Sequence, residues 1–303
     1  MRELLAKPLI VVTGKGGVGK STVAAAIGLA AAREGRRVIV AEVAARDDVS
    51  RALAGSTAGV FVERAVGNGL HHISIDPESA LEEYLRDQLP RGVADLVASS
   101  RMFGYLAAAT PGLRELLTIG KVWELAQHDR RTPGADPYDL VVLDAPATGH
   151  GVAVLSAPGT FSGAARVGPV ARQGRTIHEM VADPQRTAVV AVATAEEMPV
   201  NETLALDAAL REQLGQRLAA VVVNGVLARR FTAAELRRVE AGAPPRARRA
   251  VGAEASRCRS QRGQLGRLRR GLPEVEVDTL PFLFCESVGN DELDALARRV
   301  ARR

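Results

Sequence analysis

"PLIVVTGKGGVGKST", residues 8–22, decides the fold of this 303-residue chain. The stretch opens with an apolar, β-branched segment, which is typical of a strand buried on both faces. Residues 14–21 then match the phosphate-binding consensus G-x-x-x-x-G-K-[ST] in full, and a helical pattern follows to residue 33. A buried strand, a glycine loop and a helix in this order predict the nucleotide-binding loop of a P-loop protein.

This loop offers three kinds of contact to a nucleotide. Its glycines let backbone N–H groups converge on phosphate oxygens, and the next helix presents its positive end to them. Lys20 is placed to neutralise the β- and γ-phosphates, and Ser21 to give its hydroxyl to Mg²⁺. The predicted nucleotide-binding residues of the loop are Gly14, Lys15, Gly16, Gly17, Val18, Gly19, Lys20, Ser21 and Thr22.

The buried-strand pattern recurs along the chain, with helical patterns between the runs. It is found at residues 36–43, 138–145, 187–195 and 217–226, and in a shorter form at 71–77. Strands that alternate with helices predict an α/β fold with a doubly wound, mostly parallel sheet. Because ligands of such sheets bind at the carboxyl ends of the strands, the loops after these runs are expected to hold the site.

Two segments interrupt the alternation. Residues 90–130 have helical patterns with no strand between them, which predicts a small helical insertion. Residues 150–185 are rich in Gly, Ala and Pro and weakly periodic, which predicts part helix and part mobile loop. We therefore expect a single P-loop domain over residues 1–303, with helical, switch-linked regions at 90–130 and 150–185.

The composition favours a soluble, cytoplasmic protein. Cys258 and Cys285 have no paired spacing, which argues against a disulfide framework and fits a reducing compartment. The longest strongly apolar run, residues 23–32, is shorter than the roughly 18 residues that a membrane span needs. The glycine loop begins at residue 14, which leaves little room for a cleavable signal peptide.

Basic residues concentrate in residues 229–270, which contain 13 arginines and three glutamates, a net charge of +10. "TAAE" at 232–235 is a capping box, so this stretch is predicted to begin a helix. Such a block can contact nucleic acid or acidic lipid. It carries one aromatic residue, Phe231, and no recognition motif, so solvated helices are favoured and neither nucleic acid nor membrane is expected as a partner.

The early lysine of the loop points to a subclass. "GKGGVGKST" resembles the deviant Walker A loop of the dimeric P-loop ATPases that include MinD, ParA, the nitrogenase iron protein and the arsenical-pump ATPases. The resemblance implies the SIMIBI class of P-loop NTPases and a dimer in which Lys15 reaches the partner's nucleotide. A cation placed there would stabilise transition-state charge as an arginine finger does, so Lys15 joins Lys20 as a predicted catalytic residue.

Within that group the chain resembles the arsenical-pump (ArsA) and tail-anchored-protein-targeting ATPases, and actinobacterial ArsA-like ATPases most of all. "VVLDAPATGHGVAVLSAP" (141–158) is similar to their "DTAPTGH" signature, which implies that Asp144 holds a water on Mg²⁺ and contributes to catalysis. Asn224 occupies the position whose amide reads adenine in the family, and residues 195–203 and 280–289 resemble segments beside the dimer face and the base. The implied cofactors are ATP and Mg²⁺, with Ser21 and Asp144 at the metal.

One departure from the family concerns hydrolysis. The water-activating aspartate of the targeting ATPases aligns with Ala44, whose methyl group cannot orient a nucleophile. Glu42, two positions earlier, and Asp47 and Asp48, shortly after, are candidates to replace it, and Glu42 is included among the predicted catalytic residues. Loss of a positioned base typically lowers the rate by about 10²–10⁴. We expect intact nucleotide binding and slow hydrolysis.

Two other departures from the family concern the binding of metal ions and the binding of a client protein. The zinc-binding C-x-x-C of the targeting ATPases corresponds to residues 257–260, which contain one cysteine, so no interfacial zinc is expected. Nor do Cys258 and Cys285 make the cysteine cluster that arsenite capture requires in the family. The insert at 90–130 holds a single methionine, Met102, so packing against the body is favoured over a Met-rich client groove.

Three readings follow from the sequence. The leading one is a dimeric, Mg²⁺-dependent ATPase of the ArsA-like branch, a homodimer or a heterodimer with a paralogous ATPase, that handles an unknown protein client. The second is a nucleotide-gated interaction module that scarcely turns ATP over. The third is a ParA- or MinD-like positioning ATPase acting on DNA or membrane, which the basic residues 229–270 motivate and the "TGH" signature opposes.

Overall fold

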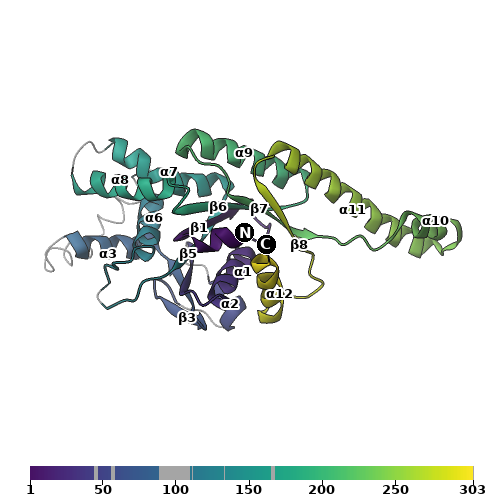
Figure 1. Cartoon of the computed structure of the whole chain (residues 1–303), viewed down its shortest axis with the longest axis horizontal. Coiled ribbons are helices and arrows are strands. Elements are labelled where there is room, and N and C mark those ends of the chain that lie inside the picture. The colour runs from purple at the N-terminus through teal and green to yellow at the C-terminus, as the bar shows by residue number, and fades with distance from the viewer. Residues whose placement is uncertain are drawn as a thin grey trace.

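A central sheet of eight strands organises the chain (Figure 1). The computed structural model describes residues 1–43, 47–55, 59–88, 110, 112–132, 134–164 and 168–302, and every structural statement below concerns these residues. The strand order is β3-β4-β2-β5-β1-β6-β7-β8, and all neighbours pair in parallel except β3 with β4. The strands are β1 (Leu9–Gly14), β2 (Val38–Val43), β3 (Arg64–Gly67), β4 (Leu70–Ile75), β5 (Leu140–Ala147), β6 (Thr187–Thr194), β7 (Ala220–Val226) and β8 (Glu276–Pro281).

Helices cover both faces of the sheet, because successive strand side chains point to opposite faces and both sets are apolar. In β1, Val12 packs on the face covered by α1 (Lys20–Arg33), α2 (Asp48–Ala54) and α12 (Asn290–Ala301). Its neighbour Val11 packs on the face covered by α6 (Leu113–Leu125), α7 (Thr148–Ala164), α8 (Pro169–Ala182), α9 (Glu197–Leu214) and α11 (Pro245–Gly271). The predicted α/β class with a doubly wound, mostly parallel sheet is confirmed.

The Gly- and Ala-rich segment 150–185 is more helical than predicted. Its described residues form most of α7 and all of α8, which pack against each other, where a part-loop structure was expected. A Cβ on Gly174 of α8 would lie 3.2 Å from the carbonyl oxygen of Pro158 on α7. The small residues therefore allow close helix packing.

The insert predicted at 90–130 is described in part, because residues 89–109 lie outside the described ranges. From residue 112 on it contains α6, which packs against α3 (Pro77–Gln88). The division into one domain over residues 1–303 with helical regions at 90–130 and 150–185 stays a prediction.

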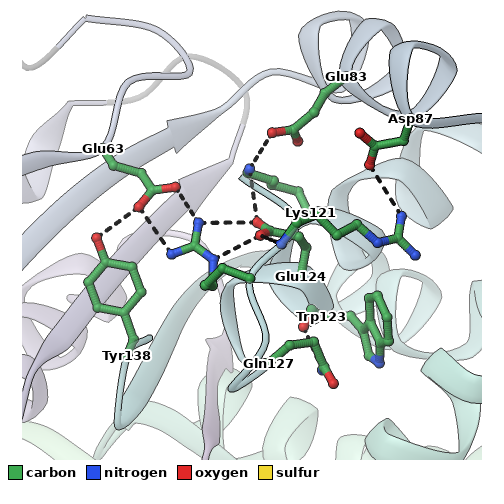
Figure 2. Close-up of polar contacts among 10 residues, drawn as sticks. Glu63, Glu83, Asp87, Lys121, Trp123, Glu124, Gln127 and Tyr138 are labelled. Carbon is green, nitrogen blue, oxygen red and sulfur yellow. Dashed lines mark hydrogen bonds and ion pairs between the residues drawn. The ribbon is translucent and has the colours of Figure 1, made fainter. Parts of the chain in front are cut away.

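A buried ionic network ties these helices to the sheet (Figure 2). The Arg130 guanidinium lies between Glu63 Oε1, at 2.6 Å, and Glu124 Oε1, at 2.8 Å. Lys121 Nζ of α6 contacts Glu124 Oε2 at 3.0 Å and Glu83 Oε1 of α3 at 2.7 Å. Burial opposes ionisation of Glu124, but hydrogen bonds and charge from Arg130 and Lys121 outweigh it and lower its pKa.

Candidate nucleotide-binding site

The glycine loop between β1 and α1 is tightly packed at its ends and open in its middle. Gly14 has φ 147°, and a Cβ there would lie 2.1 Å from the carbonyl oxygen of Val192 on β6. Gly19 has φ 91°, and a Cβ there would lie 2.4 Å from Nδ2 of Asn224. At Gly16, by contrast, a Cβ would meet no described atom within 4 Å. The loop therefore faces open space where a phosphate chain would bind.

Lys20 and Ser21 are the first two residues of α1, and their side chains contact different partners. Lys20 is buried, and its Nζ folds back to donate to the carbonyl oxygen of Lys15 at 3.1 Å. Ser21 Oγ donates to Oδ2 of Asp144 at 2.5 Å. The structure thus brings together the two residues predicted to serve the metal, although they are 123 positions apart in the sequence. Val18 is buried and Thr22 is half-buried, both beside these residues in the chain.

Asp144 reaches this position because of the sheet register. It stands opposite Val12 of β1 on one side and Glu42 of β2 on the other, so the three lie in one row near the carboxyl ends of their strands. Its exposed fraction is 4%. A buried carboxylate beside a serine hydroxyl, with open space at the nearby loop, is a pair of oxygen groups suited to Mg²⁺ and to a water bound on it.

Glu42 has a different environment, and its carboxylate is fully buried. Its Oε1 accepts from the backbone N–H of Asp48 at 3.2 Å, and its Oε2 from that of Val49 at 2.9 Å. His72 Nε2 of β4 lies 2.8 Å from the same Oε2. Glu42 therefore fixes the start of α2 to the sheet. The catalytic role predicted for it stays a prediction, and Ala44 lies outside the described residues.

Asn224 directly follows the buried part of β7 and pairs with Thr194 of β6. Its Nδ2 donates to the carbonyl oxygen of Val18 at 3.0 Å, and its Oδ1 accepts from the N–H of Gly225 at 2.9 Å. One amide hydrogen thus holds the glycine loop and one lone pair binds the neighbouring residue of β7, and the amide retains a second of each. Its predicted contact with adenine remains a prediction.

Lys15 points away from Lys20 and towards α9. Its Nζ lies 3.3 Å from Glu202 Oε1 and also contacts the Met198 sulfur. The Lys15 and Glu202 side chains are 30% and 34% exposed, and Met198 is 59% exposed. The lysine predicted to act in a partner's site is therefore held by its own chain at an accessible surface.

The sequence did not predict the partners of Glu42 and Lys15. For His72 the available signal is a polar side chain within the apolar strand pattern at 71–77, on the same face of the strand as Ser74. Glu202 and Met198 lie in the segment 195–203 assigned to the dimer face, but no local pattern links them to Lys15. Cys258 is buried and donates weakly to the carbonyl oxygen of Ala228, while Cys285 is exposed.

No helix in the described part of the chain combines the length and apolarity needed to cross a bilayer.

Comparison with known proteins identifies relatives along most of the chain. The sequence model of the anion-transporting ATPase family matches residues 7–168 and 163–301. The chain is 34% identical to ATPase BagA of Mycobacterium tuberculosis over 225 residues, which cover 71% of this chain and 64% of that protein. It is 27% identical to an arsenical pump-driving ATPase of Acidiphilium multivorum over an alignment 320 residues long, which covers 95% of this chain and 48% of that protein.

An arsenical pump-driving ATPase of Escherichia coli is also 27% identical, over 244 residues that cover 73% of this chain and 40% of that protein. The chain thus spans less than two thirds of the length of each of these relatives. The family match includes the glycine loop, Asp144 and Asn224. The chain belongs to the anion-transporting ATPase (ArsA) family.

Proposed function

We propose that the chain is a dimeric ATPase that binds Mg-ATP and uses nucleotide binding and release to close and open the dimer around a protein client. The observation that carries this proposal is the 2.5 Å hydrogen bond between Ser21 and Asp144 beside the open glycine loop. It supports a site in which phosphate and metal are held at one edge of the sheet.

Different residues at this edge of the sheet contact the phosphates, the metal and the base of the nucleotide. The loop N–H groups and the start of α1 bind the phosphates, with Lys20 supplying positive charge from the base of the loop. Ser21 would give its hydroxyl oxygen to Mg²⁺, and Asp144 would orient a water on it. The bound Mg²⁺ would neutralise charge on the β- and γ-phosphates. Asn224 holds the loop through Val18 and offers its remaining amide hydrogen to the base.

Lys15 supports the dimeric part of the proposal. Its ammonium lies at the surface against α9, so a second protomer can approach it. In the proposed closed dimer Lys15 leaves Glu202 and stabilises the triphosphate of the partner subunit. The partner is a second copy or a paralogous ATPase.

Hydrolysis is proposed to be slow. Ala44 stands where the family has its water-positioning aspartate, and the nearby Glu42 already accepts two N–H groups and contacts His72. These observations also favour a second function, a nucleotide-gated interaction module with little turnover. Single-turnover hydrolysis of the natural chain and of Ala44→Asp separates the two. If the natural chain hydrolyses ATP at a barely measurable rate and Ala44→Asp raises that rate by about 10² or more, the interaction module is favoured. Robust natural turnover rules it out.

A protein client is proposed rather than an arsenical, which the names of some relatives mention. The chain has two cysteines, and the structure leaves one buried and one exposed, whereas soft-ion capture or a zinc bridge needs converging thiols.

The solution mass tests the proposed dimer. We expect a larger mass with Mg²⁺ and a non-hydrolysable ATP analogue than with ADP, and no increase for Lys15→Ala. A chain that stays monomeric with the analogue at high concentration, alone and mixed with a paralogue, contradicts the proposal.

A further inference from the structure

A basic helical arm extends from the body of the molecule. α10 (Ala233–Gly242) and α11 are joined by a short turn and project beyond the sheet, at the right of Figure 1. Residues 229–270 carry a net charge of +10, whereas the rest of the chain carries −5. In α10, which is described throughout, no residue is buried. The positive charge of the chain is thus concentrated on solvent-facing helices.

The chain itself neutralises little of this charge. Arg257 pairs with Glu254 at 3.3 Å, and the other arginines of residues 229–270 form no ion pair with any residue that the structure describes. Like charges at this density repel one another and favour an acidic partner.

A groove of about 420 Å³ lies between the middle of α11 and the segment that leads into α10. Its exposed rim is basic and includes Arg229, Arg259 and Arg262. Its floor is less exposed and apolar and includes Phe231, Leu236 and Cys258. Glu254 also lines the groove, and its Oε1 is buried without a donor among the described residues. The groove therefore offers cations at its edge, apolar contact below them, and one carboxylate oxygen that needs an N–H.

We propose that this groove binds an acidic protein segment, with carboxylates on the arginine rim, an apolar side chain on the floor and a donor to Glu254. Arginine suits the rim because its planar guanidinium can pair with a carboxylate through two hydrogen bonds. This surface is separate from the proposed nucleotide site.

The groove discriminates between classes of acidic partner. A nucleic-acid backbone supplies negative charge but neither an apolar group nor an N–H, so a nucleic acid would have to turn a base into the groove to contact the floor and Glu254. A bilayer requires an apolar face to insert. The large apolar residues exposed in the described ranges are Val60, Val62, Met198, Phe282 and Phe284. None of them belongs to residues 229–270, and the Phe284 ring, which lies 4.5 Å from the Arg230 guanidinium, is covered in part by that arginine. An acidic peptide satisfies the rim, the floor and Glu254 together.

The test is fluorescence anisotropy of the intact chain with a labelled peptide of about 12 residues in which Glu and Asp surround Leu anchors. Arg259→Glu reverses one rim charge, and Arg248→Glu makes the same charge change nearer the turn of the arm. The two positions are roughly 16 Å apart along α11, which exceeds the screening length of about 8 Å at physiological salt. Circular dichroism and thermal melting establish that both variants are folded.

We expect Arg259→Glu to weaken peptide binding at least about tenfold and Arg248→Glu to change it less than about twofold. Phe231→Ser should weaken binding of the Leu-containing peptide and leave binding of an equally charged peptide with Ser in place of Leu unchanged. Equal losses in both charge reversals mean diffuse attraction and overturn the proposal. So does tighter binding of an equally charged oligothymidylate or of phosphatidylglycerol vesicles, or no peptide binding at all.

Discussion

Glu42 and Asp144 stand opposite each other on the adjacent strands β2 and β5, both buried, yet they bind different parts of the molecule. Asp144 accepts the Ser21 hydroxyl beside the glycine loop, whereas Glu42 accepts the first N–H groups of α2. The two carboxylates share a register and a face of the sheet. Their separate partners predict separate consequences when each is changed.

Asp144→Asn should weaken ATP binding when Mg²⁺ is present and have little effect when it is chelated. Replacing a carboxylate that orients the shell of a metal typically costs about 10–100-fold in affinity. Titration with a fluorescent ATP analogue, with Mg²⁺ and with a chelator, measures both affinities. Asp76→Asn is the matched control, because Asp76 follows the nearby strand β4 but its carboxylate caps α3 through Ser79. An equal loss with and without Mg²⁺ for Asp144→Asn contradicts its role at the metal.

Glu42→Ala should destabilise the fold by about 3–5 kcal/mol, because it removes the acceptor of two backbone N–H groups and the partner of buried His72. Asp48→Ala, a change at a more exposed acid in the first turn of α2, should cost less than about 1 kcal/mol. Urea unfolding at pH 7 measures both free energies. Similar losses in the two variants contradict the positioning role of Glu42.

Glu42→Gln distinguishes a positioning role of Glu42 from a catalytic one. The amide keeps the size of the side chain and one oxygen acceptor, but its NH2 group faces the second backbone N–H, so we expect a smaller loss of stability than in Glu42→Ala and a chain that still folds. If Glu42 orients the attacking water, single-turnover hydrolysis by this variant falls by about 10² or more while ATP affinity is unchanged.

The ionic network at Arg130 should make the free energy of unfolding depend on acid. The pKa of Glu124 is below its ordinary value of 4.5 in the folded chain, so the unfolded chain binds a proton first as the pH falls. The stabilisation by Glu124 is therefore present above pH 4.5 and is lost as the pH falls through the lowered pKa. Urea unfolding at several pH values from 7 downwards should show this loss.

Glu124→Gln should be less stable than the natural chain at pH 7 and should lose less stability on acidification. Glu82→Gln, which removes an exposed carboxylate paired with Arg86 on α3, should keep the acid dependence of the natural chain. An unchanged pH profile for Glu124→Gln contradicts the assignment.

Most of the sheet could be predicted because its central strands are apolar on both faces. The edge strands β3 and β8 were missed, since their residues are partly exposed and their sequences, "RAVG" and "EVDTLP", lack a continuous apolar run. The sequence of residues 150–185 suggested a partial loop because its glycines and prolines are poor helix formers and its apolar periodicity is weak. In the structure its small residues permit α7 and α8 to approach closely.

In the site, too, features formed by neighbouring residues could be predicted, whereas contacts between residues far apart in the sequence could not. The glycine loop follows from eight consecutive residues, and its position between a strand and a helix is local. The contact between Lys15 and Glu202 spans 187 positions, and that between Glu42 and His72 spans 30, so no spacing rule reveals them. Glu42 was selected by its nearness to Ala44 in the chain, which carries no information on burial.

Glu202→Gln should strengthen ATP-dependent dimerisation. In the free chain Glu202 holds Lys15 at 3.3 Å, and the proposed closed dimer requires that contact to break. Because both side chains are about a third exposed, each pair is worth less than about 1 kcal/mol, which sets a gain of about two- to fivefold in dimer affinity for each Lys15 that is released. Sedimentation with Mg²⁺ and a non-hydrolysable ATP analogue measures it. Glu212→Gln, an exposed change on the same helix, should have no effect.

The double variant Lys15→Ala/Glu202→Gln distinguishes release of Lys15 from a general reduction of negative charge on α9. If Glu202 acts through Lys15, the double variant should dimerise as poorly as Lys15→Ala alone, because the gain from Glu202→Gln requires the lysine. Additive effects would show that Glu202 acts on the dimer by another route. A weaker dimer in Glu202→Gln itself would mean that the carboxylate contributes to the interface, and Lys15 would then not be restrained by it.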